Sequence, residues 1–151
     1  MKPVVLYSSK SGNTRKIADA IAAELRCQTV RIDGHNAPLV EDLDNFDLIF
    51  VGTGIYAGNP NADIERYLKT ADLGRTKLFA IFIIWGGAGR TYRLVTEKLK
   101  SILEIRSQKV INDTFSCYGG WRYALLRKGH PNIKDMEDAR KWARKIINTI
   151  Y

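Results

Sequence analysis

Small and hydroxyl-bearing residues gather near the N-terminus in the run Ser8 to Thr14 (SSKSGNT), between the apolar residues Pro3 to Tyr7 and a segment with helical spacing. At such a strand-to-helix turn, backbone N–H groups, short hydroxyls and the positive end of the helix dipole can converge on one anion. Gly12 lets the backbone come close to it. An ordinary helix N-cap is the alternative, but it needs only one residue of this kind. The composition therefore favours a phosphate-binding loop.

Two further loops combine glycine with an aromatic residue. The loop 53–60 (TGIYAGNP) follows the apolar run 48–52, and the loop 85–92 (WGGAGRTY) closes the apolar run 78–85. Glycine allows a backbone to approach a ligand closely. A plain turn with a surface tyrosine is the alternative for the first loop. A core residue at a strand end is the alternative for Trp85.

These loops belong to a regular alternation of short apolar runs and longer stretches with helical periodicity. The expected strands are Pro3–Tyr7, Thr29–Ile32, Leu48–Gly52, Leu78–Trp85 and Val110–Tyr118, and the expected helices are Thr14–Leu25, Asn61–Thr70, Thr91–Leu103 and Ile133–Ile150. Strict β-then-α order predicts an α/β fold with right-handed crossovers and a doubly wound five-stranded parallel sheet. Such sheets bind ligands outside the carboxyl ends of their strands, where the strand order reverses. The three loops are therefore expected to meet at one edge.

Length and composition limit the remaining possibilities. A chain of 151 residues with 45% hydrophobic content fits one well-filled core, so a single domain over 1–151 is expected. No apolar run reaches 18 residues and no signal-peptide core is present, which favours a cytoplasmic protein. Cys27 and Cys117 lack metal-ligand spacing and are expected to be packing residues, and His35 and His130 are isolated. We expect no metal site, and no residue pattern indicates hydrolytic catalysis.

Charge is distributed unevenly. Residues 1–76 contain 9 Lys/Arg and 10 Asp/Glu, whereas residues 77–151 contain 15 and 6, and the whole chain carries a net charge of +8. A basic half of this kind is either a solvated face or a surface for an acidic partner, an anionic membrane or nucleic acid. No RNA- or DNA-binding motif accompanies the charge, so a nucleic-acid partner is not expected. Contact with a membrane surface is not indicated.

The run from Tyr7 to Thr14 resembles the flavodoxin fingerprint, in which a hydroxyl-rich Gly-Asn-Thr loop wraps the phosphate of flavin mononucleotide (FMN). The strand order of the whole chain is similar to that of short-chain flavodoxins, which lack the loop that splits the fifth strand. The resemblance implies the strand order 2-1-3-4-5, bound FMN and electron transfer. It implies phosphate contacts from the side chains of Ser9, Ser11, Asn13 and Thr14 and from the backbone N–H groups of Lys10 and Gly12.

The same resemblance implies contacts to the flavin ring from the other two loops. These are Thr53, Gly54, Ile55, Tyr56, Ala57 and Gly58 in one, and Trp85, Gly86, Gly87, Ala88, Gly89 and Tyr92 in the other. Tyr56 matches the position that stacks on the ring. Gly58 matches the position where family members turn a peptide on reduction, which glycine tolerates at low cost.

Two features depart from the family pattern. Arg90 and Arg93 stand where acidic residues are common, and a basic aromatic segment, Gly119 to Pro131 (GGWRYALLRKGHP), precedes the last helix. The leading hypothesis is a carrier that exchanges electrons with redox proteins, among them partners with acidic docking surfaces. The alternative is a flavin-dependent oxidoreductase similar to the protoporphyrinogen oxidases, with this segment covering a small-molecule substrate. The segment could equally contact a membrane or pack on the sheet edge.

Overall fold

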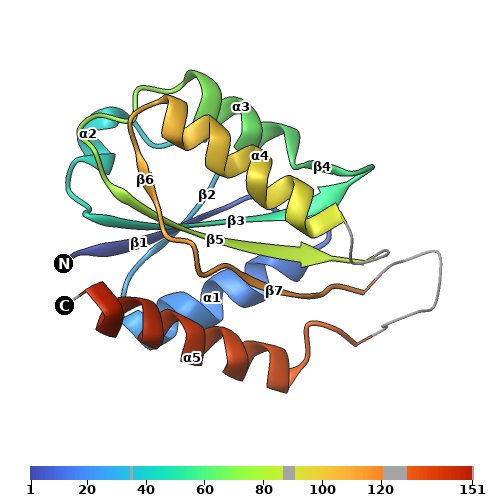
Figure 1. Cartoon of the computed structure of the whole chain (residues 1–151). Helices are drawn as coiled ribbons and strands as arrows, with labels where there is room; N and C mark the ends of the chain where they lie inside the picture. The colour runs from blue at the N-terminus through green and yellow to red at the C-terminus, as the bar shows by residue number, and fades with distance from the viewer. Residues whose placement is uncertain (35, 87–90, 121–128, 151) are drawn as a thin grey trace.

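A mostly parallel β-sheet forms the centre of the computed structural model, which describes residues 1–34, 36–86, 91–120 and 129–150 (Figure 1). Its strands lie in the order β2 (Thr29–Arg31), β1 (Pro3–Tyr7), β3 (Leu48–Tyr56) and β5 (Leu78–Trp85), followed by β6 (Lys109–Val110) and β7 (Phe115–Tyr118), which both pair with β5. With β5 as the fourth expected strand and β6 and β7 together as the fifth, the predicted order 2-1-3-4-5 is confirmed.

Helices cover both faces of this sheet. Helices α1 (Asn13–Leu25) and α5 (Ile133–Ile150) lie on one face, and α2 (Val40–Leu43), α3 (Ala62–Thr70) and α4 (Thr91–Ile105) lie on the other (Figure 1). Successive residues of β1 enter the two cores in turn: Val4 and Leu6 pack on the α3/α4 side, and Val5 and Tyr7 pack on the α1/α5 side. Both faces are buried, so the central strands are continuous apolar runs in the sequence. Among the described residues, no helix combines the length and apolarity needed to cross a membrane.

The last expected strand is interrupted. Residues 111–114 separate β6 from β7, although the pattern from Val110 to Tyr118 predicts one strand. The Asp113 carbonyl accepts a hydrogen bond from the Trp142 indole N–H at 3.3 Å, and its carboxylate contacts the Lys145 ammonium at 2.7 Å. Contacts to α5 therefore hold this interruption in place, and they link residues too far apart for a local pattern to predict them.

The third expected strand is longer than its apolar run. It was predicted to end at Gly52, but β3 continues to Tyr56 and pairs antiparallel with β4 (Asn59–Pro60). Ala57 and Gly58 form the turn, with φ values of 51° and 77°. Two consecutive positive φ values suit a two-residue hairpin because they match the twist of the strands. Helix α2 was not predicted, since four residues are too few to show periodicity.

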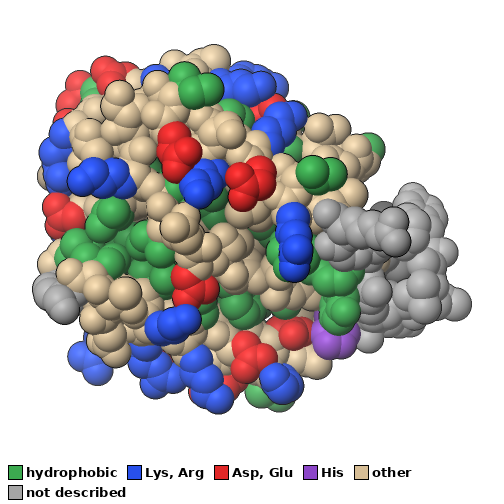
Figure 2. Space-filling view, viewed as in Figure 1, with side chains coloured by type: hydrophobic (Ala, Val, Ile, Leu, Met, Phe, Trp, Pro, Cys, Tyr) green, Lys and Arg blue, Asp and Glu red, His purple; other side chains and the backbone are tan. Residues whose placement is uncertain are grey.

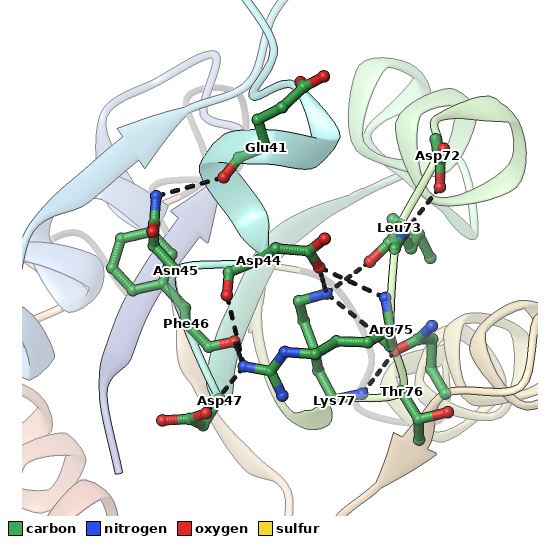
Figure 3. Close-up of polar contacts among 12 residues, drawn as sticks. Glu41, Asp44, Asn45, Phe46, Asp47, Asp72, Leu73, Arg75, Thr76 and Lys77 are labelled. Atoms are coloured by element: carbon green, nitrogen blue, oxygen red, sulfur yellow. Dashed lines mark hydrogen bonds and ion pairs between the residues drawn. The ribbon is translucent and has the colours of Figure 1, made fainter.

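A buried lysine joins the connections at the amino ends of β3 and β5, opposite the three loops (Figure 3). The Lys77 side chain is fully buried, and its Nζ contacts Asp44 Oδ1 at 2.7 Å and the carbonyls of Leu73 at 2.7 Å and Arg75 at 3.0 Å. The hydrogen bond from Lys77 lowers the pKa of the Asp44 carboxyl. Arg75 Nη2 also contacts Asp47 Oδ1 at 2.8 Å. The lysine is thus fully engaged in fixing this end of the sheet.

Candidate functional site

A cleft of about 610 Å³ lies at the carboxyl ends of β1, β3, β5 and β7. It is lined by Ser11, Asn13, Thr14, Gly54, Ile55, Tyr56, Ala57, Gly58, Ile84, Trp85, Gly86, Thr91, Gly119 and Gly120. From β1 the chain crosses to β2 on one side, and it then returns to form β3 on the other side of β1. The strand order therefore reverses at β1. The cleft therefore occupies the place where doubly wound sheets bind ligands. It brings together residues from all three predicted loops.

The first loop leaves the N-terminus of α1 open. The N-cap is Gly12, with φ 87°, and no side-chain hydrogen bond from the described residues caps the helix. The Ser9 hydroxyl instead accepts the Gly12 N–H at 2.9 Å, which stabilises the loop itself. The first N–H groups of a helix have no acceptor within the helix, and they carry the positive end of its dipole. This end of α1 can therefore accept an anion, and among the described residues no hydroxyl caps it.

Asn13 ties this loop to the end of β7. Its Nδ2 donates to the Gly120 carbonyl at 3.2 Å, and the Gly120 N–H donates to the His130 carbonyl at 2.7 Å. Gly119 lies so close that a Cβ there would be 2.8 Å from Ile84 Cγ2 and 3.0 Å from Asn13 Nδ2. The sequence interpretation assigned neither glycine to the site. The available signal was a Gly-Gly pair directly after the last expected strand, at the same edge of the sheet.

Of the predicted site residues that the structure describes, five do not line the cleft: Ser9, Lys10, Gly12, Thr53 and Tyr92. Thr53 is fully buried. Its hydroxyl donates to the Gly54 carbonyl and accepts the Asn61 N–H, both at 2.8 Å, so it supports the hairpin and the start of α3. The others lie beside the cleft, in the first loop or against Trp85. Gly87, Ala88, Gly89 and Arg90, together with residues 121–128 and His35, fall outside the described residues.

Tyr56 lies between the hairpin and the first loop. Its hydroxyl is 3.4 Å from the backbone nitrogen of Lys10, which donates to it, and the Lys10 Nζ is 4.8 Å from the centre of its ring. A Cβ on Gly54 would be 3.0 Å from the tyrosine hydroxyl oxygen, so this position leaves little room for a side chain. The structure thus places an aromatic plane beside the anion-accepting end of α1.

A row of rings contains Trp85, which also lines the cleft. Trp85 lies nearly parallel to Tyr92, with ring centres 6.2 Å apart, and meets Tyr118 edge-on at 4.3 Å. Tyr118 in turn meets the His130 ring at 5.7 Å, and His130 Nδ1 lies 2.6 Å from Asp135 Oδ2. Trp85 is half-buried and serves both roles considered from the sequence, since it packs at a strand end and faces the cleft.

Neither cysteine is suited to nucleophilic chemistry. Burial raises the pKa of the Cys117 thiol to about 12, with Asp135 and Asp138 adding to the effect, and burial raises that of Cys27 to about 11. Both thiols are free and protonated near neutral pH. Cys117 is buried against the sheet, which confirms its prediction as a small packing residue.

The model of the flavodoxin domain family matches residues 4–132. The chain belongs to the flavodoxin family. Flavodoxins of similar length share its fold over almost their whole length. One is an archaeal flavodoxin with a TM-score of 0.74 and 20% identity, covering 99% of both chains. Another is flavodoxin 1 of Bacillus cereus, with a TM-score of 0.73 and 22% identity, covering 98% of both chains. These agree with the predicted short-chain type.

Three further proteins are similar to the chain in sequence. This flavodoxin-family chain is 31% identical to an uncharacterised protein of Methanocaldococcus jannaschii, covering 97% of this chain and 99% of the relative. It is 32% identical to the flavodoxin-like domain-containing protein BilS of Clostridioides difficile, covering 98% and 83%. The similarity to the protoporphyrinogen IX dehydrogenase [quinone] of Escherichia coli K12 is 30% over 71 residues, which is 46% of this chain and 39% of that enzyme.

Proposed function

We propose that this protein binds FMN in the cleft and carries electrons between redox proteins. One observation carries the proposal: the uncapped N-terminus of α1 opens at a cleft that two aromatic residues, Tyr56 and Trp85, also line. An anion-accepting end next to aromatic planes fits a ligand with a phosphate and a flat ring. The cleft volume of about 610 Å³ lies in the ordinary range for cofactor sites.

Different residues of the cleft would bind the phosphate and the ring of FMN. Ser11, Asn13 and Thr14, with the first N–H groups of α1, would hold the phosphate, because charge-assisted hydrogen bonds to an oxyanion are strong. Tyr56 and Trp85 would flank the ring. Bound FMN supplies one- and two-electron redox chemistry, while the protein orients the cofactor and tunes its potentials. The hairpin turn at Gly58, where φ is already positive, supports the implied role of its peptide beside the ring.

Binding is tested by titrating apoprotein with FMN and following the quenching of flavin fluorescence. Ser11→Ala combined with Asn13→Ala is expected to weaken binding by about 2–4 kcal/mol, or roughly 30- to 1,000-fold, through lost hydrogen bonds to a charged group. The matched control is Ser101→Ala with Asn148→Ala, two exposed positions on α4 and α5. Wild-type affinity in the first variant would mean that the phosphate binds elsewhere.

Electron transfer is tested by a stepwise anaerobic reduction of the FMN-loaded protein, followed by visible absorbance. Entry of the two electrons in separate steps supports a carrier, because a carrier exchanges electrons singly. Entry of both electrons together supports the second candidate, a flavin-dependent oxidoreductase acting on a small molecule. That candidate is favoured by the partial similarity to the E. coli protoporphyrinogen IX dehydrogenase. Failure to bind FMN would overturn both.

A further inference from the structure

Within the part of residues 77–151 that the structure describes, most Lys and Arg side chains form ion pairs. On α5, Lys134 contacts Asp138 at 2.6 Å and Lys145 contacts Asp113 at 2.7 Å. Arg144 contacts Glu24 of α1 at 3.2 Å. Figure 2 shows Lys and Arg side chains interspersed with Asp and Glu over this view of the molecule. The basic residues that α5 contributes to the positive charge of residues 77–151 therefore lie on a solvated face, where most of them are ion-paired.

The rim of the cleft is different. Four exposed cations lie in the elements around it, although none lines the cleft itself: Lys10, Lys16, Arg31 and Arg93. None of them pairs with a carboxylate of the described residues. Arg31 donates to the Ser9 carbonyl at 3.1 Å, which keeps its guanidinium beside the first loop. Lys10 lies over the ring of Tyr56 and Arg93 lies beside Tyr92. We call these four side chains the cationic rim.

Four carboxylates of the described residues lie in the segments near this edge. Asp33 accepts the Asn36 N–H at 2.9 Å, and Glu97, one turn after Arg93 on α4, forms no ion pair with it. Asp63 contacts Arg66 at 3.6 Å, and Asp135 accepts the Asn132 N–H at 2.8 Å besides meeting His130. A phosphate monoester in the cleft carries about two negative charges. The four cations of the rim outnumber those two charges. The rim therefore has more charge than the cofactor would use.

We propose that the cationic rim docks an acidic redox protein, an inference that rests on the function proposed above. Its cations come from three elements around the mouth: the β1–α1 loop with the first turns of α1, the end of β2, and the start of α4. They lie on open surface rather than in a second cavity, which suits a macromolecule better than a small acidic substrate. Leu94 is 69% exposed next to Arg93 and offers the apolar contact that protein interfaces use. Complementary charge steers such a partner toward the cleft.

The test compares two probe proteins of opposite charge, acidic cytochrome b5 and basic cytochrome c. FMN-loaded, reduced protein is mixed with each by stopped flow at ionic strengths from about 0.02 to 0.5 M, where screening changes strongly. The rate constant with cytochrome b5 is expected to fall steeply with salt. Lys16→Glu with Arg93→Glu is expected to lower it about tenfold at low salt. Lys109→Glu with Lys141→Glu makes the same charge change away from the rim, at exposed residues of β6 and α5, and is expected to change the rate by less than about threefold.

A second readout does not depend on electron transfer. Adding cytochrome b5 to the apoprotein at low salt is expected to shift backbone NMR signals of α1 and α4, and the shifts should vanish in the rim variant only. If the protein fails to bind FMN, the proposed function and the docking proposal both fail. If it binds FMN but shows no salt-dependent preference for cytochrome b5, only the docking proposal fails. Rim-dependent retention on DNA or on anionic phosphatidylserine vesicles would also overturn it, in favour of those partners.

Discussion

Gly119→Ala tests whether the end of β7 shapes the cleft. The added Cβ would lie 2.8 Å from Ile84 Cγ2 and 3.0 Å from Asn13 Nδ2, whereas ordinary contacts begin at 3.4 Å. Relief needs a shift of about 0.6 Å, and overpacking of this kind costs about 1–3 kcal/mol. For a chain of this size each kcal/mol lowers Tm by about 2–4 °C, so a fall of roughly 2–12 °C is expected.

The same substitution should also lower the affinity for the cofactor. The added Cβ displaces Asn13, which lines the cleft and is proposed to hold the phosphate, and losing about 1 kcal/mol of that contact corresponds to about fivefold weaker FMN binding. Thermal unfolding by circular dichroism and a fluorescence titration with FMN measure the two effects. Gly34→Ala is the matched control, because the nearest atom to its Cβ is 4.0 Å away. The reasoning is refuted if Gly119→Ala keeps the wild-type Tm and FMN affinity, or if Gly34→Ala perturbs both equally.

Three further predictions concern the sheet and its side chains. Gly52→Ala should unfold the protein or lower its Tm sharply, because its Cβ would be 2.0 Å from Phe82 Cζ, and Phe82→Leu in the same chain should restore part of the loss in a thermal melt. Lys77 lowers the pKa of Asp44 in the folded protein, so the ionised carboxylate stabilises the fold above the ordinary aspartate pKa of about 3.9. This stabilisation is lost as pH falls through the pKa of Asp44 in the folded state. The difference in Tm between wild type and Asp44→Asn should therefore narrow below about pH 4. Cys117, with its pKa raised to about 12, should react with iodoacetamide at pH 8 at least about tenfold more slowly in the native state than in denaturant, as peptide mass spectrometry would show.

The fold was predictable where local pattern and tertiary burial agree. Strand β5 was predicted as Leu78–Trp85 and helix α5 as Ile133–Ile150, and both have those bounds. Successive residues of β5 enter the two hydrophobic cores in turn. Helix α5 buries an apolar stripe that includes Trp142 and Ile146. Both segments therefore carry in their own sequence the pattern that their distant packing partners require.

The hairpin after β3 could not be predicted in the same way. Thr53 and Gly54 have loop-like composition, but their conformation is fixed by pairing with β5 and by the Thr53 hydroxyl. The turn at Ala57 also lacks the Asn-Gly or Asp-Gly signal that usually marks two consecutive positive φ values. Composition was therefore a poor guide to where this strand ends.

The candidate site was predictable in part, for a similar reason. The three loops were recognised because each follows an apolar strand, and most of the residues predicted in them line the cleft. Gly119 and Gly120 were missed because their place beside Asn13 depends on the order of strands in the sheet. That order brings together residues 107 positions apart, which no local spacing shows.

The link between Asn13 and Gly120 also sets an order of events during synthesis. The first loop leaves the ribosome before the glycines that complete the cleft, which emerge only after more than a hundred further residues. At about 5–20 residues per second this interval lasts roughly 5–20 s. Throughout that time the nascent chain displays an anion-accepting helix end without the wall that faces it. The proposed binding of a flavin to the complete cleft would therefore have to wait for the synthesis of Gly119 and Gly120.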